Sequence, residues 1–402
     1  MVKPERRTKG DLIAAAAIAV AIALGATLIW WNSDARATIS RPAEKPVPQL
    51  RSAHEVPTTL HELWTAPSGR TTQPVVVGGV VVSADGHQMD GRDPTTGTSL
   101  WSFSRDKDLC GVTSVYQYAV AVYPDERGCG QVSTVDAISG HRGPARTSLA
   151  DPEVRLSTDG STVLSYGDSR LEQWRSDVVR MISYGYLDAR VKPGVPATPL
   201  CRLVSAAASP SSVAVMEACP GQSDMRLTLL KPGKEEDQPD IKRVTQSGVS
   251  PDSDAQVIAV ADTKVAVYVP TPTPSVNVID ETGSTIASTV LPRPAAPVTA
   301  MTRAGNYITW YTGDSVVVLD SALNYKYTVS PAGNQAPIGP ATVMAGRLLV
   351  PVTSGYDTFD AETGAPRTHI ALSRTPVNTA VIPAVAGSTV VEQRGNQLVA
   401  LG

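Results

Sequence analysis

The sequence predicts an all-β protein, a single eight-bladed β-propeller preceded by one transmembrane α-helix. Beyond the N-terminus, Val, Thr, Ser, Gly and Pro dominate the composition, which favours many short strands and tight turns. A short phrase that begins with Asp and ends with Gly recurs along the chain, each time after an apolar run. Self-similarity at a period of about 40 residues indicates a repeat architecture, in which copies of one small sheet cover each other's faces.

The recurring phrase has a mechanical interpretation. Its Asp ends a strand and accepts hydrogen bonds from the backbone of the next turn, while its Gly supplies a positive φ. We expect such turns at four places, formed by Asp93 with Gly97, Asp136 with Gly140, Asp280 with Gly283, and Asp360 with Gly364.

Strand signals group into eight sets, and the last of them has only three strands. The sets cover residues 74–103, 110–146, 154–184, 201–244, 255–291, 298–330, 341–372 and 381–401. The missing strand is expected at residues 61–65, so that the start of the folded segment completes the last blade. Such closure leaves no long open sheet edge. Seven blades are the alternative, because the third and fourth sets are irregular and a Pro-rich stretch at 191–200 separates them.

The chain begins with a predicted membrane anchor. Residues 12–31 form an uncharged apolar run whose length as a helix matches the hydrocarbon core of a bilayer, and the run ends in Trp30 and Trp31. Residues 1–11 carry more basic than acidic side chains, which predicts a cytoplasmic tail and export of everything after the helix.

Cleavage after Ala37 is the alternative, since Ala35-Arg36-Ala37 resembles a signal-peptidase site and would release a secreted protein. The apolar run exceeds the 7–15 residues usual for a signal peptide, which favours the uncleaved anchor. Residues 32–59 contain four prolines and are expected to form an extended linker to a propeller at 60–402.

The four cysteines suit disulfides in an exported domain. Pairing Cys110 with Cys129 and Cys201 with Cys219 closes two short loops, each within one blade. Zinc is the alternative, but the sequence has no C-x-x-C motif and no nearby His pair.

One segment resembles a known family. Gly91, Asp93, Gly97 and Trp101 have the spacing Gly-x-Asp-x-x-x-Gly-x-x-x-Trp, which resembles the tryptophan-docking repeat of quinoprotein-like (PQQ-type) β-propellers. The resemblance implies that Trp101 packs against the neighbouring blade. Only the first blade carries the full motif, since Pro144 and Thr368 stand at the matching offset in the second and seventh. The layout also resembles membrane-anchored actinobacterial envelope proteins of this class, whose function is not established.

No reaction centre is evident in the sequence. The quinoprotein dehydrogenases of the family carry adjacent cysteines, which this chain lacks, so we expect no quinone cofactor. Phosphate-binding glycine loops and the G-x-S-x-G motif are missing, and none of the five histidines lies in a zinc-protease motif. Asp85, Asp90 and Asp93 lack the alternation of an EF-hand loop and are interpreted as turn formers. We therefore expect no catalytic, cofactor-binding or metal-binding residue.

These observations favour a binding protein over an enzyme. A net charge of −3 and a pI near 6.0 give no basic footprint for nucleic acid. The hypothesis is a single-pass anchor that presents an extracytoplasmic propeller to protein partners in the cell envelope, as a scaffold. The alternative is a small-ligand binder or enzyme that uses the central funnel, with a sugar or wall fragment as ligand.

Overall fold

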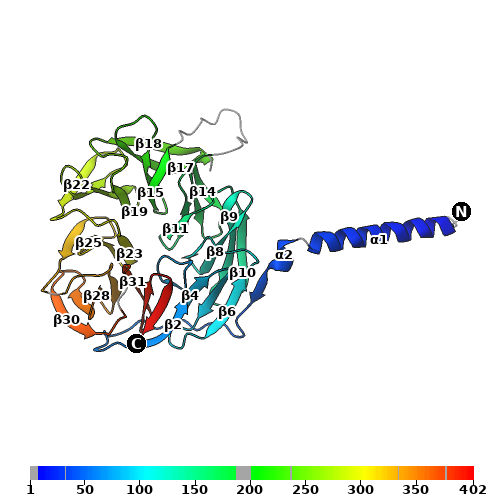
Figure 1. Ribbon diagram of the computed structural model, residues 1–402, viewed down its shortest axis with the longest axis horizontal. Coiled ribbons are helices and arrows are strands. Elements are labelled where there is room, and N and C mark those ends of the chain that lie inside the picture. Colours follow the sequence, from blue (N-terminus) through cyan, green and yellow to red (C-terminus); the bar gives the residue numbers. More distant parts are fainter. Residues whose placement is uncertain (1–7, 32, 187–200, 236–237, 334, 376–377) are drawn as a thin grey trace.

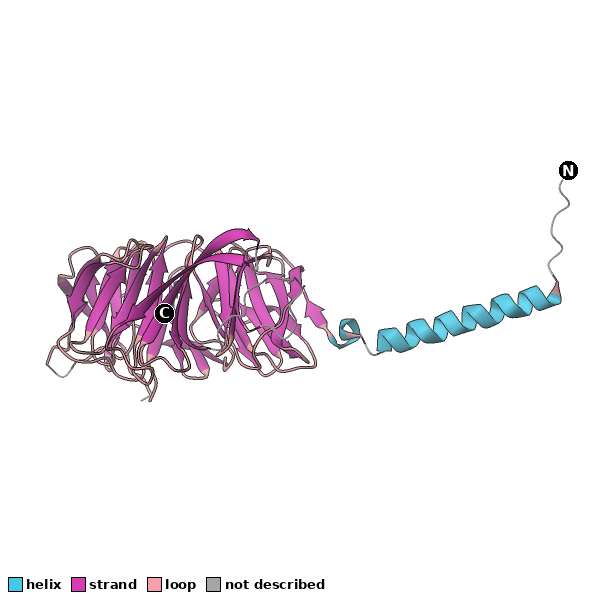
Figure 2. Ribbon diagram, turned by 90° about the horizontal axis from the view of Figure 1, so that it is seen from above, coloured by secondary structure: helices cyan, strands magenta, loops and turns pink. Residues whose placement is uncertain are grey.

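The chain folds into a ring of eight β-sheets, with one long helix leaving its rim (Figures 1 and 2). This computed structural model describes residues 8–31, 33–186, 201–235, 238–333, 335–375 and 378–402. Each sheet has four antiparallel strands, which in blades 1 to 7 follow sequence order from the centre to the rim, and the first sheet has a fifth strand. The prediction of an eight-bladed β-propeller is confirmed, and the seven-bladed alternative is wrong. The Pro-rich stretch at 191–200 lies outside the described residues.

The first four blades take their strands from the first half of the folded segment. They are blade 1, with β3 (Val75–Val77), β4 (Val80–Asp85), β5 (Gln88–Arg92) and β6 (Ser99–Ser104); blade 2, with β7 (Gly111–Val115), β8 (Tyr118–Asp125), β9 (Gly128–Asp136) and β10 (Arg142–Thr147); blade 3, with β11 (Arg155–Thr158), β12 (Thr162–Tyr166), β13 (Arg170–Arg175) and β14 (Arg180–Gly185); and blade 4, with β15 (Arg202–Ala208), β16 (Val213–Ala218), β17 (Met225–Glu235) and β18 (Gln238–Gln246).

The remaining blades follow the same plan. They are blade 5, with β19 (Gln256–Ala261), β20 (Lys264–Val269), β21 (Ser275–Ile279) and β22 (Thr285–Val290); blade 6, with β23 (Ala300–Ala304), β24 (Tyr307–Tyr311), β25 (Val316–Asp320) and β26 (Tyr325–Val329); blade 7, with β27 (Thr342–Met344), β28 (Arg347–Val352), β29 (Gly355–Asp360) and β30 (Pro366–Ala371); and blade 8, with β31 (Val381–Ala386), β32 (Thr389–Arg394), β33 (Gln397–Leu401) and β2 (Glu62–Pro67).

Blade 8 joins the two ends of the folded segment, as the sequence predicts. Strand β2 pairs with β33 in a register that sets Glu62 opposite Leu401 and Pro67 opposite Gln397. Reciprocal backbone hydrogen bonds between His61 and Gly402 extend the pairing past the last strand, at 3.0 and 3.1 Å. The ring is therefore closed by main-chain hydrogen bonds between its first and last strands.

The core lies between the blades. The second strand of a blade is covered on both faces by its neighbours, which is why β4 and β20 read as continuous apolar runs rather than alternating ones. Among the described residues, eight clusters of buried apolar side chains are found, one at each junction between successive blades. Tyr268 of blade 5 and Trp310 of blade 6 are typical, with ring centroids 5.2 Å apart.

Helix α1 (Lys9–Trp31) has no buried residue and packs on no part of the ring. It is long and apolar enough to cross a membrane, a property that membrane anchors share with N-terminal signal sequences. A four-residue helix, α2 (Asp34–Ala37), follows it directly.

The segment expected to be a linker, residues 32–59, is in large part docked on the ring. Strand β1 (Ile39–Arg41) pairs antiparallel with β6, which gives blade 1 its fifth strand. The prediction of a free tether is therefore wrong for residues 39–47, which pair with blades 1 and 2. Its prolines favour extended backbone, and extended backbone is also what an added β-strand requires.

The rest of the segment crosses neighbouring blades. The backbone N–H of Val47 donates to the carbonyl of Ile138 in blade 2, at 2.9 Å, and the Val47 side chain is only 8% exposed. Thr59 then forms an isolated bridge with Ala371 in blade 7. Apolar contacts along this path hold the segment in place, so few residues separate α1 from the folded head.

Candidate functional site

A cavity of about 530 Å³ lies in the central channel of the ring. The innermost strands of six blades line it, mostly with small, hydroxyl-bearing or aliphatic side chains. Its lining includes one basic side chain, Arg303 on β23, and one acidic side chain, Asp159 in the turn between β11 and β12. A polar channel of this size accommodates a small ligand.

Arg303 reaches across the channel to the neighbouring blades. Its guanidinium donates to the backbone carbonyl of Val260 at 2.9 Å and to that of Ala208 at 3.4 Å. Enclosure by the channel walls lowers the pKa of Arg303, and the charge of Asp159 partly opposes this effect. The side chain thus joins the inner edges of blades 4, 5 and 6.

The Asp159 side chain stabilises the turn in which it lies. Its Oδ1 accepts hydrogen bonds from the backbone N–H groups of Ser161 and Thr162, at 2.8 and 2.7 Å. Acid–base hydrolysis would need a second carboxylate or a histidine close by. Neither belongs to the described lining of the channel.

The four Asp–Gly turns connect the third and fourth strands of their blades. In blade 1, Asp93 Oδ1 accepts the N–H groups of Thr95 and Thr96 at 2.9 and 2.8 Å, and Gly97 has φ +73°. Asp136 and Gly140 repeat this geometry in blade 2, with φ +71° at the glycine.

Blade 7 has the same turn as blades 1 and 2, and blade 5 has a related turn that is one residue shorter. Asp280 Oδ1 accepts two backbone N–H groups ahead of the fourth strand, and Gly283 has φ +89°. Asp360 does so in blade 7, where Gly364 has φ +71°. Hydrogen bonds from Arg367 and Thr363 lower the pKa of the Asp360 carboxyl to about 2.

A fifth copy of the turn escapes the sequence analysis because its glycine is replaced. Asp320 in blade 6 accepts the N–H groups of Ala322 and Asn324, both at 2.9 Å, while Leu323 adopts φ +67°. Leu323 is 1% exposed and belongs to the apolar cluster between blades 5 and 6. Burial of its side chain compensates for the strain of a left-handed backbone.

Trp101 packs on the turn of the next blade. Its indole N–H donates to the carbonyl of Ala137 at 2.9 Å, and a Cβ at Gly140 would lie 2.6 Å from the Trp101 Cβ. Trp64 on β2 repeats this contact at the ring closure, donating to Pro94 at 2.9 Å. Tyr327 donates to Ala361 at 2.8 Å in the same way.

The two disulfides have the pairing that the sequence predicts, Cys110 with Cys129 and Cys201 with Cys219. Glu217 lies beside the second, with ligand atoms within 4.8 Å of both sulfurs, which is close enough for a metal ion. However, the sulfurs are bonded to each other, and Arg226 donates both to Glu217 (2.9 Å) and to Cys201 (3.2 Å). A cation already occupies the position that a metal ion would take.

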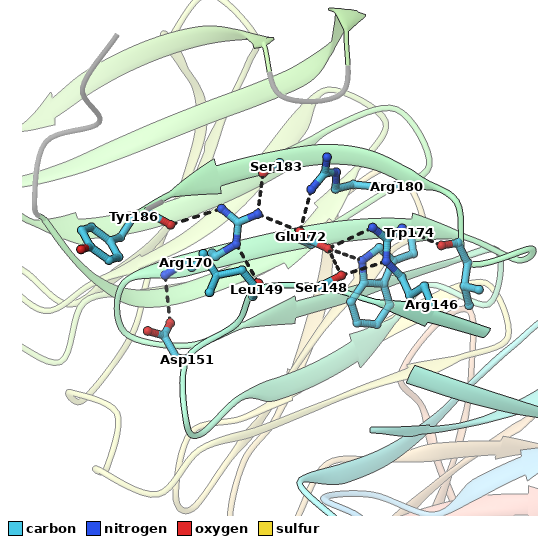
Figure 3. Close-up of polar contacts among 11 residues, drawn as sticks. Arg146, Ser148, Leu149, Asp151, Arg170, Glu172, Trp174, Arg180, Ser183 and Tyr186 are labelled. Carbon is cyan, nitrogen blue, oxygen red and sulfur yellow. Dashed lines mark hydrogen bonds and ion pairs between the residues drawn. The ribbon is translucent and has the colours of Figure 1, made fainter. Parts of the chain in front are cut away.

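The densest buried polar cluster surrounds Glu172 on β13 (Figure 3). Its carboxylate is 3% exposed and lies 2.8 Å from Arg170, 3.0 Å from Arg180 and 3.7 Å from Arg146. Burial alone raises the pKa of Glu172, but the Arg170 charge and hydrogen bonds from Trp174 and Ser148 outweigh it, so the pKa is lowered. Arg146 and Ser148 come from the end of blade 2, so the cluster joins two blades.

Two other buried glutamates each accept a hydrogen bond from a tyrosine of the preceding blade. Tyr184 of blade 3 donates to Glu217 of blade 4 at 2.7 Å, and Tyr356 of blade 7 donates to Glu392 of blade 8 at 2.5 Å. Arg374 and Arg394 neutralise Glu392. Sequence reasoning missed all three glutamates, because nothing local distinguishes a buried Glu from an exposed one.

One serine–histidine–aspartate arrangement lies on blade 7. Ser354 Oγ is 3.4 Å from His369 Nε2, and His369 Nδ1 is 2.7 Å from Asp357. The Ser354 hydroxyl also accepts a hydrogen bond from Gln335 at 2.7 Å. Ser354 and His369 are exposed, and the three residues are outside the lining of the channel. We interpret the arrangement as a surface hydrogen-bond chain.

Asp85, Asp90 and Asp93, which the sequence places near one another, have separate roles. Asp90 accepts hydrogen bonds from Gln88 and Ser99, Asp93 holds its turn, and Asp85 is exposed.

Comparison with known proteins supports the fold. No protein-family model matches the sequence, and no curated protein matches it. The crystal structure of BamB from Moraxella catarrhalis is similar with a TM-score of 0.53 and 13% identity, covering 85% of this chain and 99% of that one. The C-terminal WD40 domain of Sif2 has a TM-score of 0.54 and 8% identity, covering 87% and 99%. The dihydro-heme d1 dehydrogenase NirN, in complex with DHE, has a TM-score of 0.50 and 11% identity, covering 84% and 78%. The chain is a β-propeller protein.

Proposed function

We propose that this protein is a membrane-anchored, extracytoplasmic β-propeller of the quinoprotein-like repeat class, and that it acts as a protein-binding scaffold in the cell envelope. One observation carries the proposal. The ring closes on itself through β2 and β33, while α1, which is uncharged and largely apolar from Leu12 to Trp31, has no buried residue. An apolar helix of this length that the rest of the chain does not cover is suited to the hydrocarbon core of a bilayer.

Three further features support this assignment. The basic residues before α1 favour a cytoplasmic N-terminus, and the two disulfides suit an oxidising compartment outside the membrane. The polar clusters around Glu172, Glu217 and Glu392 lock blades together and leave a rigid ring. A rigid ring with many exposed turns provides a broad surface for binding proteins.

Protease protection tests the anchor. Full-length protein with an N-terminal epitope tag is treated with protease in intact spheroplasts. We expect digestion of the head and survival of the tag. A charge in the middle of α1, as in Val20→Arg, should release the protein from the membrane fraction. Mature protein that begins at Thr38 in the culture medium would contradict the anchor and establish the secreted form.

Crosslinking in intact cells tests the scaffold. We expect the full-length chain to co-purify with one or a few membrane or wall proteins after reversible crosslinking, and a variant cleaved from its anchor to lose them. Failure to recover any protein, together with binding of a small ligand by the purified head, would overturn the scaffold.

A second candidate function is a small-ligand site in the channel, for a sugar or wall fragment. The position of Arg303 and Asp159 in a cavity of about 530 Å³ favours it. Thermal-shift measurements with soluble wall fragments test it, and Arg303→Gln should abolish any stabilisation by a ligand bound there.

A further inference from the structure

The outermost strand of every propeller blade has backbone groups on one side that its own sheet leaves unpaired. Proteins guard such edges against pairing with another chain by charged side chains, prolines or coverage. Six of the eight outer strands here carry at least one Asp, Glu, Lys or Arg: β2, β10, β14, β18, β26 and β30.

The other two outer strands are uncharged, and only one of them is covered. Strand β6, of sequence SLWSFS, is covered by β1, which sets Ile39 opposite Ser104 and Arg41 opposite Ser102. Strand β22, of sequence TIASTV, ends its sheet, and within the described residues no strand pairs with its outer side. Blade 5 therefore presents the kind of edge that blade 1 hides.

The side chains of β22 are also exposed and apolar. Ile286 is 50% exposed and Val290 is 63% exposed. Side chains two residues apart lie on the same face of a regular strand, so Ser288 and Val290 share one face, and Ile286 lies at a β-bulge before them. The Ser288 hydroxyl donates to Asn277 on β21, which leaves Ile286 and Val290 as apolar side chains exposed to the solvent.

We propose that the outer edge of β22 is a docking site for an extended, uncharged segment of a partner protein, which pairs with it as a fifth strand of blade 5. The proposal rests on the scaffold function and names the surface that would carry it. Main-chain hydrogen bonds supply the affinity in this mode, and side chains at alternate positions supply the specificity.

Two observations indicate that an extended, uncharged segment binds at this edge: the lack of charge on β22 and the pairing of β1 with β6 in blade 1. A segment rich in Lys or Glu would find no opposite charge on β22, whereas a neutral segment loses no solvation of charge on pairing. Strand β1 shows that an extended segment fits the equivalent edge of blade 1. In Figure 1, β22 lies on the side of the ring away from α1, so the anchor leaves this edge open to a partner.

A second copy of this chain fits less well. Two folded rings that meet edge to edge touch along their convex rims and would contact each other at little more than the two six-residue strands, whereas stable interfaces between folded proteins bury roughly 1,200 Å² or more. An extended segment has no such rim and follows the strand along its whole length.

Site-specific photocrosslinking in the full-length, membrane-bound protein tests the proposal. A benzophenone amino acid is placed at position 288 or 290, and the adducts are mapped by mass spectrometry. We expect both positions to crosslink to one segment of one partner, at partner residues about two apart, as strand pairing requires. Ile286→Lys gives β22 the charge of the other outer strands and should lower the yield at least tenfold.

Ile241→Lys is the matched control. Ile241 is 42% exposed on β18, an outer strand that already carries Asp240, Lys242 and Arg243. This variant should leave the yield unchanged. Val290→Lys is a second test variant, used with the crosslinker at position 288. Unchanged thermal midpoints and intact disulfides check that each variant folds.

The outcomes separate the docking edge from the scaffold itself. Adducts that map to another copy of this chain, adducts that Ile286→Lys leaves intact, or no adduct at either position would overturn the docking edge. The scaffold survives that result if a crosslinker at Tyr325, exposed on β26, captures a partner. If neither edge captures a protein and chemical crosslinking also fails, both proposals fall.

Discussion

The indole nitrogen of Trp101 donates a hydrogen bond to the carbonyl oxygen of Ala137, across the junction between blades 1 and 2. Trp64 makes the same contact with Pro94 between blades 8 and 1. In both cases the acceptor is the residue that follows the Asp of the turn. The motif therefore works as a joint between blades, and the joint at Trp64 lies where the ring closes.

Removing only the hydrogen bond at these joints should weaken the fold measurably. Trp64→Phe and Trp101→Phe keep an aromatic ring but lose the donor, so each should lower the free energy of unfolding by about 1 kcal/mol or more. Urea denaturation of the purified head measures the change. Unaltered midpoints in both variants would contradict the role of these bonds.

Gly140→Ala should cost more than another glycine with the same backbone angle. The new Cβ would lie 2.6 Å from the Trp101 Cβ, at a residue whose φ is +71°. Gly346 has φ +72° with no atom within 4 Å of an added Cβ, so Gly346→Ala isolates the backbone strain, which is on the order of 1 kcal/mol. We expect Gly140→Ala to exceed that control by at least about 1 kcal/mol in urea denaturation, since overpacking adds to strain.

Stability should fall in acid through the buried glutamates. Burial alone raises the pKa of Glu392, but hydrogen bonds and charge from Arg374, with the charge of Arg394, outweigh it and hold the pKa below its ordinary value of 4.5. A carboxyl whose folded pKa is lowered stabilises the protein fully above the unfolded value, and this stabilisation is lost as pH falls through the folded pKa. The unfolding free energy should therefore drop below about pH 4.5.

Glu392→Gln tests the source of that drop. It leaves the buried Arg374 without its counter-charge, while Arg394 keeps Glu62 as a partner, and should cost about 3–5 kcal/mol at neutral pH. It should also flatten the decline in acid, as followed by thermal unfolding between pH 3 and 7. An unchanged slope in the variant would assign the acid dependence to other carboxyls.

The disulfides should each stabilise the head by about 3 kcal/mol, because they close loops of 19 and 18 residues in sequence separation. Replacing Cys110 and Cys129 together by Ala should lower the thermal midpoint, and so should the same change at Cys201 and Cys219. Alkylation of four free thiols in non-reduced protein isolated from cells would show that the bridges do not form there.

Removing the docked segment should uncover the edge of β6. A head that begins at Thr38 keeps β1, whereas one that begins at residue 60 loses it. We expect the longer form to be monomeric, and the shorter form to be less stable and prone to self-association through the uncharged β6. Size-exclusion chromatography and thermal unfolding compare the two.

Much of the architecture can be predicted from the sequence because several blades have the same Asp and Gly residues in the turn before their fourth strand. Asp93 and Asp136 mark turns in which one carboxylate accepts two backbone N–H groups, and a glycine follows with positive φ. The junction between blades 5 and 6 could not be predicted in this way. The position of blade 5 that is in register with Trp101 of blade 1 is Ala287, which has a small side chain. The large side chain at this junction is Leu323, from the turn of blade 6.

The sites depend on contacts that no local pattern carries. Glu172 is buried beside Arg180 of β14 and Arg146 of blade 2, and Glu392 is buried beside Tyr356 of blade 7. Residues 39–41 look like part of a Pro-rich tether until the uncharged edge of β6 is set beside them. Side-chain complementarity of this kind appears only when the ring has closed.

The pairing of β2 with β33 has a consequence for how the protein is made. Strand β2 precedes the strands of the first seven blades in the chain, whereas its partner β33 follows all of them. Until β33 is made, the first seven blades have all their strands, but blade 8 is incomplete and the ring is open. The five residues of β33 therefore close the ring. A variant that lacks β33 should be degraded by proteases rather than function as a smaller ring.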